Sequence, residues 1–383
     1  MRVWPEERRM TGCQISTIEK IEAIPFSMPL KRATKWARGA NKANDHVLVR
    51  VYSSSGAVGT TEAVPRPTIY GETQVSIVHM IEKFLAPMLV GSDPHDRVGY
   101  WSKFDTYQWN PTAKGALDIA IHDLLAQEAG LPLAKFLGGA DPDPLRISYM
   151  LPLSSPETCV KEATEIKEQF GINAFKVKAG LDPANDLERV RRLREALGSD
   201  CFLFIDANQG YTIDVAIRTL EQMLTYNIAM VEEPLRVDMS RQRKRLADAV
   251  PIPILTDDSV ITLADVKREL ELGAAGVIGI KPPRTGIYNS LRILHAAEVF
   301  GLPCWIGSQG VSDIGTMASA HFYAAAARQT IPFPADLGNY LAQVDHLLET
   351  PVVLRDGCIH LSNQPGVDAA VSDEKLRRFR IDR

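Results

Sequence analysis

Phe175-Lys176-Val177-Lys178 opens a series of short apolar stretches that end in charge, and the series continues with Phe204-Ile205-Asp206-Ala207-Asn208, Val231-Glu232-Glu233-Pro234, Leu255-Thr256-Asp257-Asp258 and Ile278-Gly279-Ile280-Lys281-Pro282. The charged ends recur every 24 to 30 residues, the length that a strand, a helix and two loops need in a repeated β/α unit. Seven or eight such units between residues 141 and 340 predict a TIM-type (β/α)7–8 barrel. An open doubly wound sheet is the alternative, but no Gly-x-Gly-x-x-Gly segment follows its first strand.

The regions on either side of the barrel predict a capping domain. Residues 1–14 read as a disordered leader, and residues 15–140 read as an α+β domain. Within it we expect a β-stretch, an irregular basic loop over 31–45, a hairpin over 46–63 and helices near 75–89 and 111–129. A last barrel strand is expected near 330–335. Residues 341–383 fit no further barrel unit and are expected to return to the capping domain.

Composition narrows the class of protein. Of 383 residues, 45% are hydrophobic and 23% charged, with a net charge of −4, as in ordinary globular proteins. The charge balance argues against nucleic acid as a partner, and no apolar run is long enough to cross a membrane. The N-terminus lacks the apolar core of a signal peptide, and the five cysteines form no disulfide or zinc spacing. We therefore expect a cytoplasmic protein with reduced thiols.

Three of the charged strand ends are acids on consecutive strands. Polar residues at the carboxyl ends of barrel strands are the catalytic candidates, and barrel closure brings Asp206, Glu232 and Asp257 close together. Carboxylates crowded in a partly dry site repel one another unless a cation compensates them. An all-oxygen set of ligands suits Mg²⁺ or Mn²⁺ better than zinc. These three residues are therefore the predicted metal ligands.

Lysines flank the acids on both sides. Lys176 and Lys178 are two residues apart and point to the same face of their strand, and Lys281 ends a later strand. A cation and a second lysine nearby lower the pKa of a lysine towards the range that proton transfer needs. Metal and lysines together are equipment for making an enolate from a carboxylate substrate. We predict that Lys178 and Lys281 move protons and that Lys176 contacts the substrate carboxylate.

At these residues the sequence resembles the enolase superfamily, specifically its muconate lactonizing enzyme subgroup. The matching motifs are KVK at 176–178, DAN at 206–208, EEP at 232–234, TDD at 256–258 and IKPPRTG at 280–286. The resemblance implies the same three metal ligands, with Lys178 and Lys281 as the acid/base pair and Lys176 and Asn208 beside them. It also implies a homo-oligomer, either a dimer or an octamer.

The chain departs from the family pattern at some positions. Asp258 stands where the family usually has glutamate, and Val311 stands where many muconate cycloisomerases have one. Gln309 and Asp313 offer polar groups near Val311. The mandelate racemase subgroup has a histidine after strand seven, where this chain has Gly-Ser-Gln at 307–309. The PRP…YGET loop at 65–73 and the GSQ segment at 307–309 resemble those of muconate cycloisomerases with anti lactonisation, which implies Lys281 as the proton donor with Lys178 assisting.

Two loops are expected to choose the substrate. The cations of the 31–45 loop, Lys31 and Arg32 among them, are predicted to bind the distal carboxylate of a dicarboxylate, and Trp36 lies in the same loop. Tyr70 and Arg66 are candidates in the second loop, and Gln309 is a candidate after strand seven. His295 and His321 both lie in helical patterns and are assigned to helix packing.

The predicted reaction is lactonisation of cis,cis-muconate or a related unsaturated dicarboxylate through an enolate. An amino-acid racemase or epimerase, or an o-succinylbenzoate synthase, uses the same lysines and metal and is the main alternative. An acid-sugar dehydratase is a further alternative. A non-catalytic binding barrel would have no need of both Lys178 and Lys281, so their presence argues against it.

Overall fold

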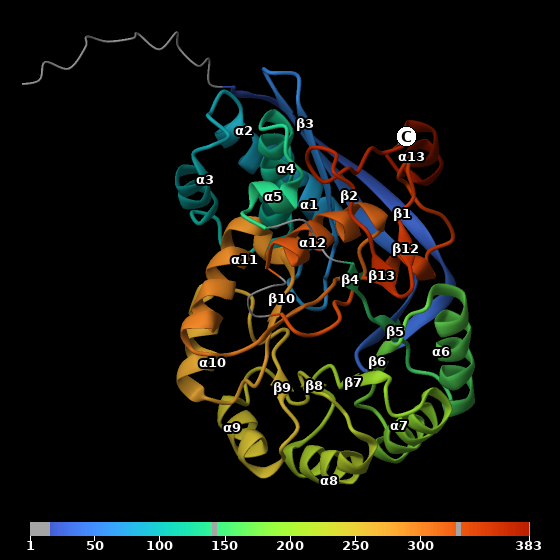
Figure 1. The fold of residues 1–383 in the computed structure, drawn as a ribbon. Coiled ribbons are helices and arrows are strands. Elements are labelled where there is room, and N and C mark those ends of the chain that lie inside the picture. Colours follow the sequence, from blue (N-terminus) through green and yellow to red (C-terminus); the bar gives the residue numbers. More distant parts are fainter. Residues whose placement is uncertain (1–15, 140–143, 327–330, 383) are drawn as a thin grey trace, which may run out of the picture.

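The structure is a computed structural model, and it describes residues 16–139, 144–326 and 331–382. The expected leader over residues 1–14 lies outside the described residues. A capping region made of a sheet and helices sits on one end of a ring of alternating strands and helices (Figure 1). The boundaries expected between the domains at residues 140 and 340 stay predictions.

The capping region begins with an antiparallel sheet of order β1-β2-β3. Its elements are β1 (Ile18–Trp36), β2 (Gly39–Ser53), β3 (Val58–Ala63), α1 (Gln74–Met80), η1 (Ile81–Leu85), α2 (Ala86–Leu89), α3 (Arg97–Phe104), α4 (Pro111–Glu128) and α5 (Leu133–Phe136). α4 is the central helix of this region, and nearly its whole length is buried. Its buried residues include the polar side chains of Lys114, Asp118, His122 and Asp123, and the helix is covered by β2 and β3 and by a barrel helix, α11.

The expectation of an irregular loop over 31–45 is wrong. β1 and β2 continue past the barrel mouth as one hairpin, and Trp36 pairs with Gly39 across its turn. The pairing shifts register between Pro29 and Thr34, because proline has no N–H to donate to the ladder. The hairpin arm is polar on both faces, so it shows no apolar alternation from which the strand could be recognised.

The barrel contains alternating parallel strands and helices. In chain order they are β4 (Leu145–Arg146), β5 (Tyr149–Leu151), α6 (Pro156–Phe170), β6 (Ala174–Lys178), α7 (Pro183–Leu197), β7 (Phe202–Asp206), α8 (Ile213–Met223), η2 (Leu224–Tyr226), β8 (Val231–Glu232), α9 (Ser240–Ala249), β9 (Ile254–Leu255), α10 (Leu263–Leu272), β10 (Ile278–Ile280), α11 (Pro282–Val299), β11 (Cys304–Ile306) and α12 (Asp313–Ala326). β4 is antiparallel to a C-terminal strand and stands outside the ring. Helices α6 to α11 surround the strands (Figure 1).

Single bridges close the ring between the longer pairings. Strands β5 to β9 form one parallel sheet, and β10 pairs with β11. A bridge between Leu255 and Val277 joins these two sheets. On the other side, Asp336 N donates to Ile306 O at 2.9 Å, and Ala335 bridges to Ile147. The strand expected near 330–335 is therefore reduced, within the described residues, to this short contact that completes the barrel.

The C-terminal segment contacts the capping region. It contains η3 (Asn339–Ala342), β12 (Leu354–Arg355), β13 (Cys358–Ile359) and α13 (Asp373–Phe379). β13 pairs with β4, and Phe26 of β1 forms a bridge with Arg380. Figure 1 shows α13 beside β1.

A buried carboxylate joins the cap to the barrel. Glu62 of β3 accepts hydrogen bonds from Ser312 N at 2.6 Å and Gly315 N at 3.1 Å, at the start of α12. The unpaired N–H groups and the dipole at a helix start favour a negative charge there. His46 Nδ1 lies 2.9 Å from the same carboxylate. This contact fixes the cap sheet over the loop that follows β11.

The two histidines assigned to helix packing differ. His321 is fully buried in α12, and its Nδ1 accepts from Ala134 N at 3.2 Å. His295 lies on α11 but is exposed, so its assignment to packing is wrong. The helical periodicity predicted the helix, but it did not show that His295 lies on the exposed face of that helix.

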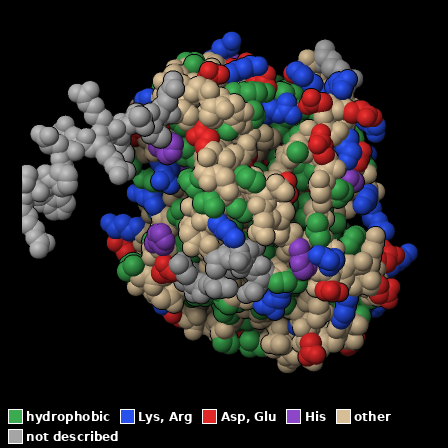
Figure 2. Space-filling view, turned by 45° about the horizontal axis from the view of Figure 1, so that its top comes forward, with side chains coloured by type: hydrophobic (Ala, Val, Ile, Leu, Met, Phe, Trp, Pro, Cys, Tyr) green, Lys and Arg blue, Asp and Glu red, His purple; other side chains and the backbone are tan. Residues whose placement is uncertain are grey.

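The surface of the described residues carries mixed charge. On the face shown in Figure 2, Lys and Arg side chains lie among Asp and Glu side chains. Within the described part of the chain, no helix combines the length and apolarity that crossing a membrane requires.

Replacing Glu62 with alanine is expected to lower the free energy of unfolding by about 3 kcal/mol, because buried N–H groups at the start of α12 lose their acceptor. Chemical denaturation measures this change. Glu82 is an exposed carboxylate of the same region, and Glu82→Ala is expected to change stability by less than about 0.5 kcal/mol. Equal effects of the two substitutions would contradict the role of Glu62 in joining the cap to the barrel.

Burial lowers the pKa of His321 to about 4. Because the folded pKa lies below the unfolded value, the stability contributed by neutral His321 is present above pH 6.5 and is lost as the pH falls through 4. From pH 7 to pH 4 this amounts to about 3 kcal/mol. The gap in unfolding free energy between wild type and His321→Asn is expected to shrink by that amount over this range. A gap independent of pH would refute the assignment.

Candidate functional site

The register of the barrel strands brings the predicted residues together. Lys178 of β6 is paired with Asp206 of β7, and Asp206 is paired with Glu232 of β8. Asp257 and Lys281 follow the ends of β9 and β10. All five therefore stand at the carboxyl ends of adjacent parallel strands, where barrel enzymes carry their active sites.

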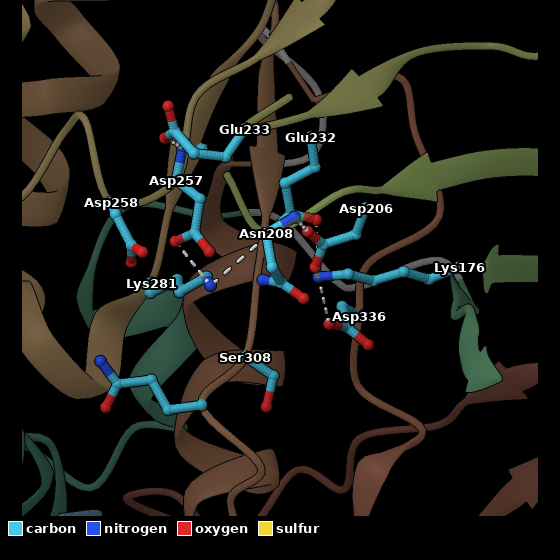
Figure 3. A network of polar contacts seen from close by, with 12 residues as sticks. Lys176, Asp206, Asn208, Glu232, Glu233, Asp257, Asp258, Lys281, Ser308 and Asp336 are labelled. Atoms are coloured by element: carbon cyan, nitrogen blue, oxygen red, sulfur yellow. Dashed lines mark hydrogen bonds and ion pairs between the residues drawn. The ribbon is translucent and has the colours of Figure 1, made fainter. Parts of the chain in front are cut away.

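Ammonium and carboxylate groups alternate across this end of the barrel. Lys176 Nζ lies 3.0 Å from Asp206 Oδ2 and 2.5 Å from Glu232 Oε2. Lys281 Nζ lies 2.6 Å from Asp257 Oδ1 and 3.7 Å from Glu232 Oε1. Figure 3 shows Lys176 and Lys281 approaching the acids from two sides. Lys178 completes the row with contacts of 2.6 Å to Asp206 and 2.9 Å to Asn208.

This row sets the pKa values of its members. Burial alone would lower the pKa of Lys281, but the carboxylates of Asp257 and Glu232 outweigh burial and raise it. The pKa of Lys176 is likewise raised against burial, by Asp206 and Glu232. Burial and the neighbouring Asp206 carboxylate raise the pKa of Glu232 to about 8. The lysines alone therefore do not fully compensate the acids.

The residues present fit a divalent cation. Among the described residues no three carboxylate, histidine or cysteine side chains stand ready around one point, because lysine ammonium groups occupy the space between the acids. Both carboxylate oxygens of Glu232 are nevertheless buried without a hydrogen bond, although buried polar groups rarely stay so. Three buried carboxylates at the ends of adjacent strands form a donor set of the kind that hard cations prefer.

The backbone around the acids is shaped for this arrangement. Asn208 has a φ of 44° and Glu233 a φ of 37°, a backbone conformation that is unusual for residues other than glycine. Glu233 points away from the site and accepts from the N–H groups of Asp257 and Ser259, both at 2.9 Å. A Cβ at Gly307 would lie 2.7 Å from Cε of Lys281. Glycine is therefore required there for the lysine to pass.

A cavity of about 380 Å³ opens above the row. Its floor is the barrel end, and the cap supplies its roof through Trp36, Arg66 and Tyr70. Tyr70 OH accepts from Gln309 Nε2 and from Arg284 Nη1, both at 2.9 Å. Arg284 in turn donates to Asp257 Oδ1 at 3.0 Å. The cap loop is thus hydrogen-bonded to an arginine that holds one of the predicted metal ligands.

Most of the predicted site residues line this one cavity. They are Lys176, Lys178, Asp206, Asn208, Asp257, Lys281, Trp36, Tyr70 and Gln309. Glu232 lies beneath it, in contact with Lys176 and Lys281.

Lys31 and Arg32 do not line the cavity. They line a neighbouring cleft of about 210 Å³ beside α6. Lys31 Nζ donates to Leu341 O at 2.9 Å, and Arg32 lies 3.7 Å from Glu162 and 3.5 Å from Glu165. The expectation that these two cations hold the substrate is corrected, because the hairpin turns them away from the barrel mouth.

The residues near the expected glutamate position separate into two groups. Val311 has an apolar side chain and is fully buried, so it offers the cavity no polar group. Asp313 accepts from Leu347 N at 2.9 Å and Leu348 N at 2.8 Å, which ties down the C-terminal segment. Of the polar side chains expected near Val311, only Gln309 faces the cavity.

Two residues of the site were missed. Arg284 is fully buried and lies within the IKPPRTG segment, where its burial was not foreseeable from its charge. Asp336 lines the cavity and lies 3.4 Å from Lys176. Its position after the last strand follows the same strand-end rule that identified the other acids, so this signal was available.

Comparison with known proteins places the chain in a family. Residues 158–375 match the family described as enolase C-terminal domain-like, and residues 20–138 match the mandelate racemase / muconate lactonizing enzyme N-terminal domain. A D-Ala-D/L-Ala epimerase of Cytophaga hutchinsonii is 33% identical over 306 residues, which is 79% of this chain and 83% of the relative.

Two solved structures superpose over almost the whole chain. The muconate lactonizing enzyme of Mycobacterium smegmatis, complexed with muconolactone, is 38% identical with a TM-score of 0.92, covering 96% of this chain and 100% of that one. A dipeptide epimerase of Cytophaga hutchinsonii, complexed with Mg and D-Ala-L-Val, is 30% identical with a TM-score of 0.89, covering 95% and 98%.

These matches confirm the barrel, the cap and the expected family. The chain belongs to the mandelate racemase / muconate lactonizing enzyme family of the enolase superfamily, as an enzyme of its epimerase and cycloisomerase branch.

Proposed function

We propose that the protein is a divalent-metal cycloisomerase that lactonises cis,cis-muconate or a related unsaturated dicarboxylate through an enolate. The observation that carries the proposal is the row of buried lysines and carboxylates at the barrel end, with Lys178 and Lys281 at its two ends. Two ammonium groups on opposite sides of an acidic centre suit transfer of a proton to a carbon beside a carboxylate.

Asp206, Glu232 and Asp257 are the proposed ligands of Mg²⁺ or Mn²⁺. The cation supplies the positive charge that stabilises an enolate next to it. Lys176, buried against Asp206 and Glu232, keeps a positive charge where the substrate carboxylate approaches. Asn208 holds Lys178 through its amide oxygen.

In the proposed lactonisation one carboxylate oxygen attacks the distant alkene carbon, and a C–O bond forms as the double-bond electrons move towards the other carboxylate. Lys281 Nζ then gives its proton to the α-carbon, and solvent later returns a proton to the amine. Lys281 is the proposed donor because the family resemblance of the sequence implies it; both lysines are ion-paired, Lys281 to Asp257 and Lys178 to Asp206, each at 2.6 Å. Lys178 assists by its charge on the opposite side.

Epimerisation of a dipeptide is the second candidate. It is favoured by the epimerase relatives, and by Asp336, a carboxylate in the cavity that can accept from an ammonium group. Epimerisation needs one lysine to remove the α-proton and the other to deliver one on the opposite face. The two reactions therefore place different demands on Lys178.

Mg²⁺ at about 100 times its Kd is expected to stabilise the wild type by about 2.7 kcal/mol, seen as a rise in Tm. Glu232→Gln is expected to abolish that rise while costing little stability without metal, because burial and the Asp206 carboxylate already disfavour the charged form of Glu232. Asp258→Asn removes a neighbouring carboxylate that bonds to Gln209 and serves as the control, with its rise retained. A retained rise in Glu232→Gln would refute the ligand assignment.

Incubation with cis,cis-muconate and Mn²⁺ is expected to bleach the diene absorbance. Lys281→Ala is expected to reduce kcat by about 10²- to 10⁴-fold, through loss of the proton donor, and Lys178→Ala by less. Lys83→Ala, an exposed lysine of the cap, is the control with unchanged kcat.

Dipeptides in D₂O give the rival outcome. Exchange of the α-hydrogen that disappears equally in Lys178→Ala and Lys281→Ala, without any bleaching of muconate by wild type, would replace lactonisation with epimerisation. Unchanged turnover in both variants would refute the catalytic roles.

A further inference from the structure

Arg66 is a cation of the cavity that forms no ion pair within the described residues. Among the described residues, every other cationic side chain of the cavity lies within 4.0 Å of a carboxylate: Lys176, Lys178 and Lys281. No carboxylate of the described chain lies that close to the Arg66 guanidinium. Arg66 is half-buried, and burial lowers its pKa while the more distant carboxylates of Asp257 and Asp258 raise it.

The surroundings of Arg66 hold it in place. Its carbonyl accepts from Tyr70 N at 2.9 Å, and its backbone bridges to Glu72. Glu72 is buried and accepts from Thr112 N and Ala113 N, both at 3.1 Å, at the start of α4. The loop is thus anchored to the central cap helix. An arginine on an anchored loop loses little freedom when it binds.

The guanidinium lies at the end of the cavity that faces the loop after β11. A Cβ at Gly310 would lie 2.9 Å from Nη2 of Arg66 and 3.3 Å from the amide nitrogen of Asn44. Asn44 Nδ2 donates to Gly310 O at 3.1 Å and also lines the cavity. Gln309, one residue earlier, bonds to Tyr70. Two donor side chains of the cap therefore meet at one place on the cavity wall.

Asp257 and Asp258 act on Arg66 only from beyond ion-pair distance, and Asp257 is already paired with Lys281 and Arg284. Asp336 lies 3.4 Å from Lys176 and accepts from Asn339 at 3.0 Å. Asp45 is exposed at the rim and accepts from Ser27 at 2.8 Å. A half-buried guanidinium without an ion pair can form charge-assisted hydrogen bonds, so an anion supplied from outside the protein would be bound favourably at this position.

We infer that Arg66, assisted by Asn44, is the specificity-determining residue that binds a second anionic group of the substrate, at the end remote from the predicted metal ligands. The inference rests on the proposed function and names its substrate class: a small dicarboxylate whose first carboxylate meets Lys176. It takes the role that the sequence assigned to Lys31 and Arg32. An ammonium group at the remote end, as in a dipeptide, would be repelled by Arg66.

The test is calorimetric binding to the Mg²⁺-loaded protein of two unreactive acids, adipate and hexanoate. They share a six-carbon chain and differ in the second carboxylate. Wild type is expected to bind adipate about 10- to 100-fold more tightly, as charge-assisted hydrogen bonds to a partly buried arginine predict. Arg66→Gln is expected to erase this preference and leave hexanoate binding unchanged, while Arg66→Lys restores part of it.

Arg38→Gln is the matched control. Arg38 lies at the hairpin turn, 4.0 Å from Asp258 and outside the cavity lining. Its loss removes the same charge and is expected to change adipate affinity by less than about twofold, as for a screened surface charge. Equal affinities of the two acids in wild type, or equal weakening in Arg66→Gln and Arg38→Gln, would overturn the inference.

The result is separable from the proposed reaction. Arg66-dependent adipate binding without bleaching of muconate would leave the subsite standing and refute lactonisation. Bleaching of muconate with an unchanged KM in Arg66→Gln would support lactonisation and refute the Arg66 subsite.

Discussion

Mutual compensation of buried charge at the carboxyl ends of the barrel strands is the constraint on which the rest of the structure depends. Asp206, Glu232 and Asp257 come from three neighbouring strands, and their repulsion would cost stability if nothing separated them. Lysine ammonium groups now stand between them, 2.5 to 3.7 Å from Glu232. The compensation is incomplete, because burial and Asp206 raise the pKa of Glu232 to about 8 despite these lysines. Because the charges of the site are not fully compensated within the protein, binding of a cation and an anionic substrate is favoured there.

The cap serves this site by closing it. Glu62 fixes the cap sheet to the start of α12, and Asp118 of α4 accepts from Ile287 N at 2.5 Å in α11. Tyr70 joins the cap loop to Arg284, which holds Asp257. Roof and floor of the cavity are thus hydrogen-bonded to each other at the residues that do the proposed chemistry. Excluding water in this way strengthens the electrostatic interactions inside.

The sequence predicted what depends on short-range pattern. Even spacing of charged strand ends located the barrel and the acids and lysines of its mouth, because parallel strands repeat with a fixed period. The sequence did not predict the placement of residues whose position depends on tertiary contacts. The 31–45 segment is polar on both faces, so nothing marked it as a hairpin or showed that Lys31 points into another cleft. Arg284 is fully buried, and no local sequence rule predicts the burial of an arginine. Whether Arg66 forms an ion pair depends on where the acids of other segments lie in the fold, which the local sequence does not show.

The central claim is that the three strand-end acids form a single divalent-metal site beneath the cavity. Anomalous diffraction from crystals grown with Mn²⁺ tests it most directly, since the ion is located without reference to activity. The account predicts one strong peak within about 2.0–2.3 Å of oxygens from Asp206, Glu232 and Asp257, with the Lys176 ammonium moved off the ion. A peak elsewhere in the barrel, or none at these carboxylates, would contradict it.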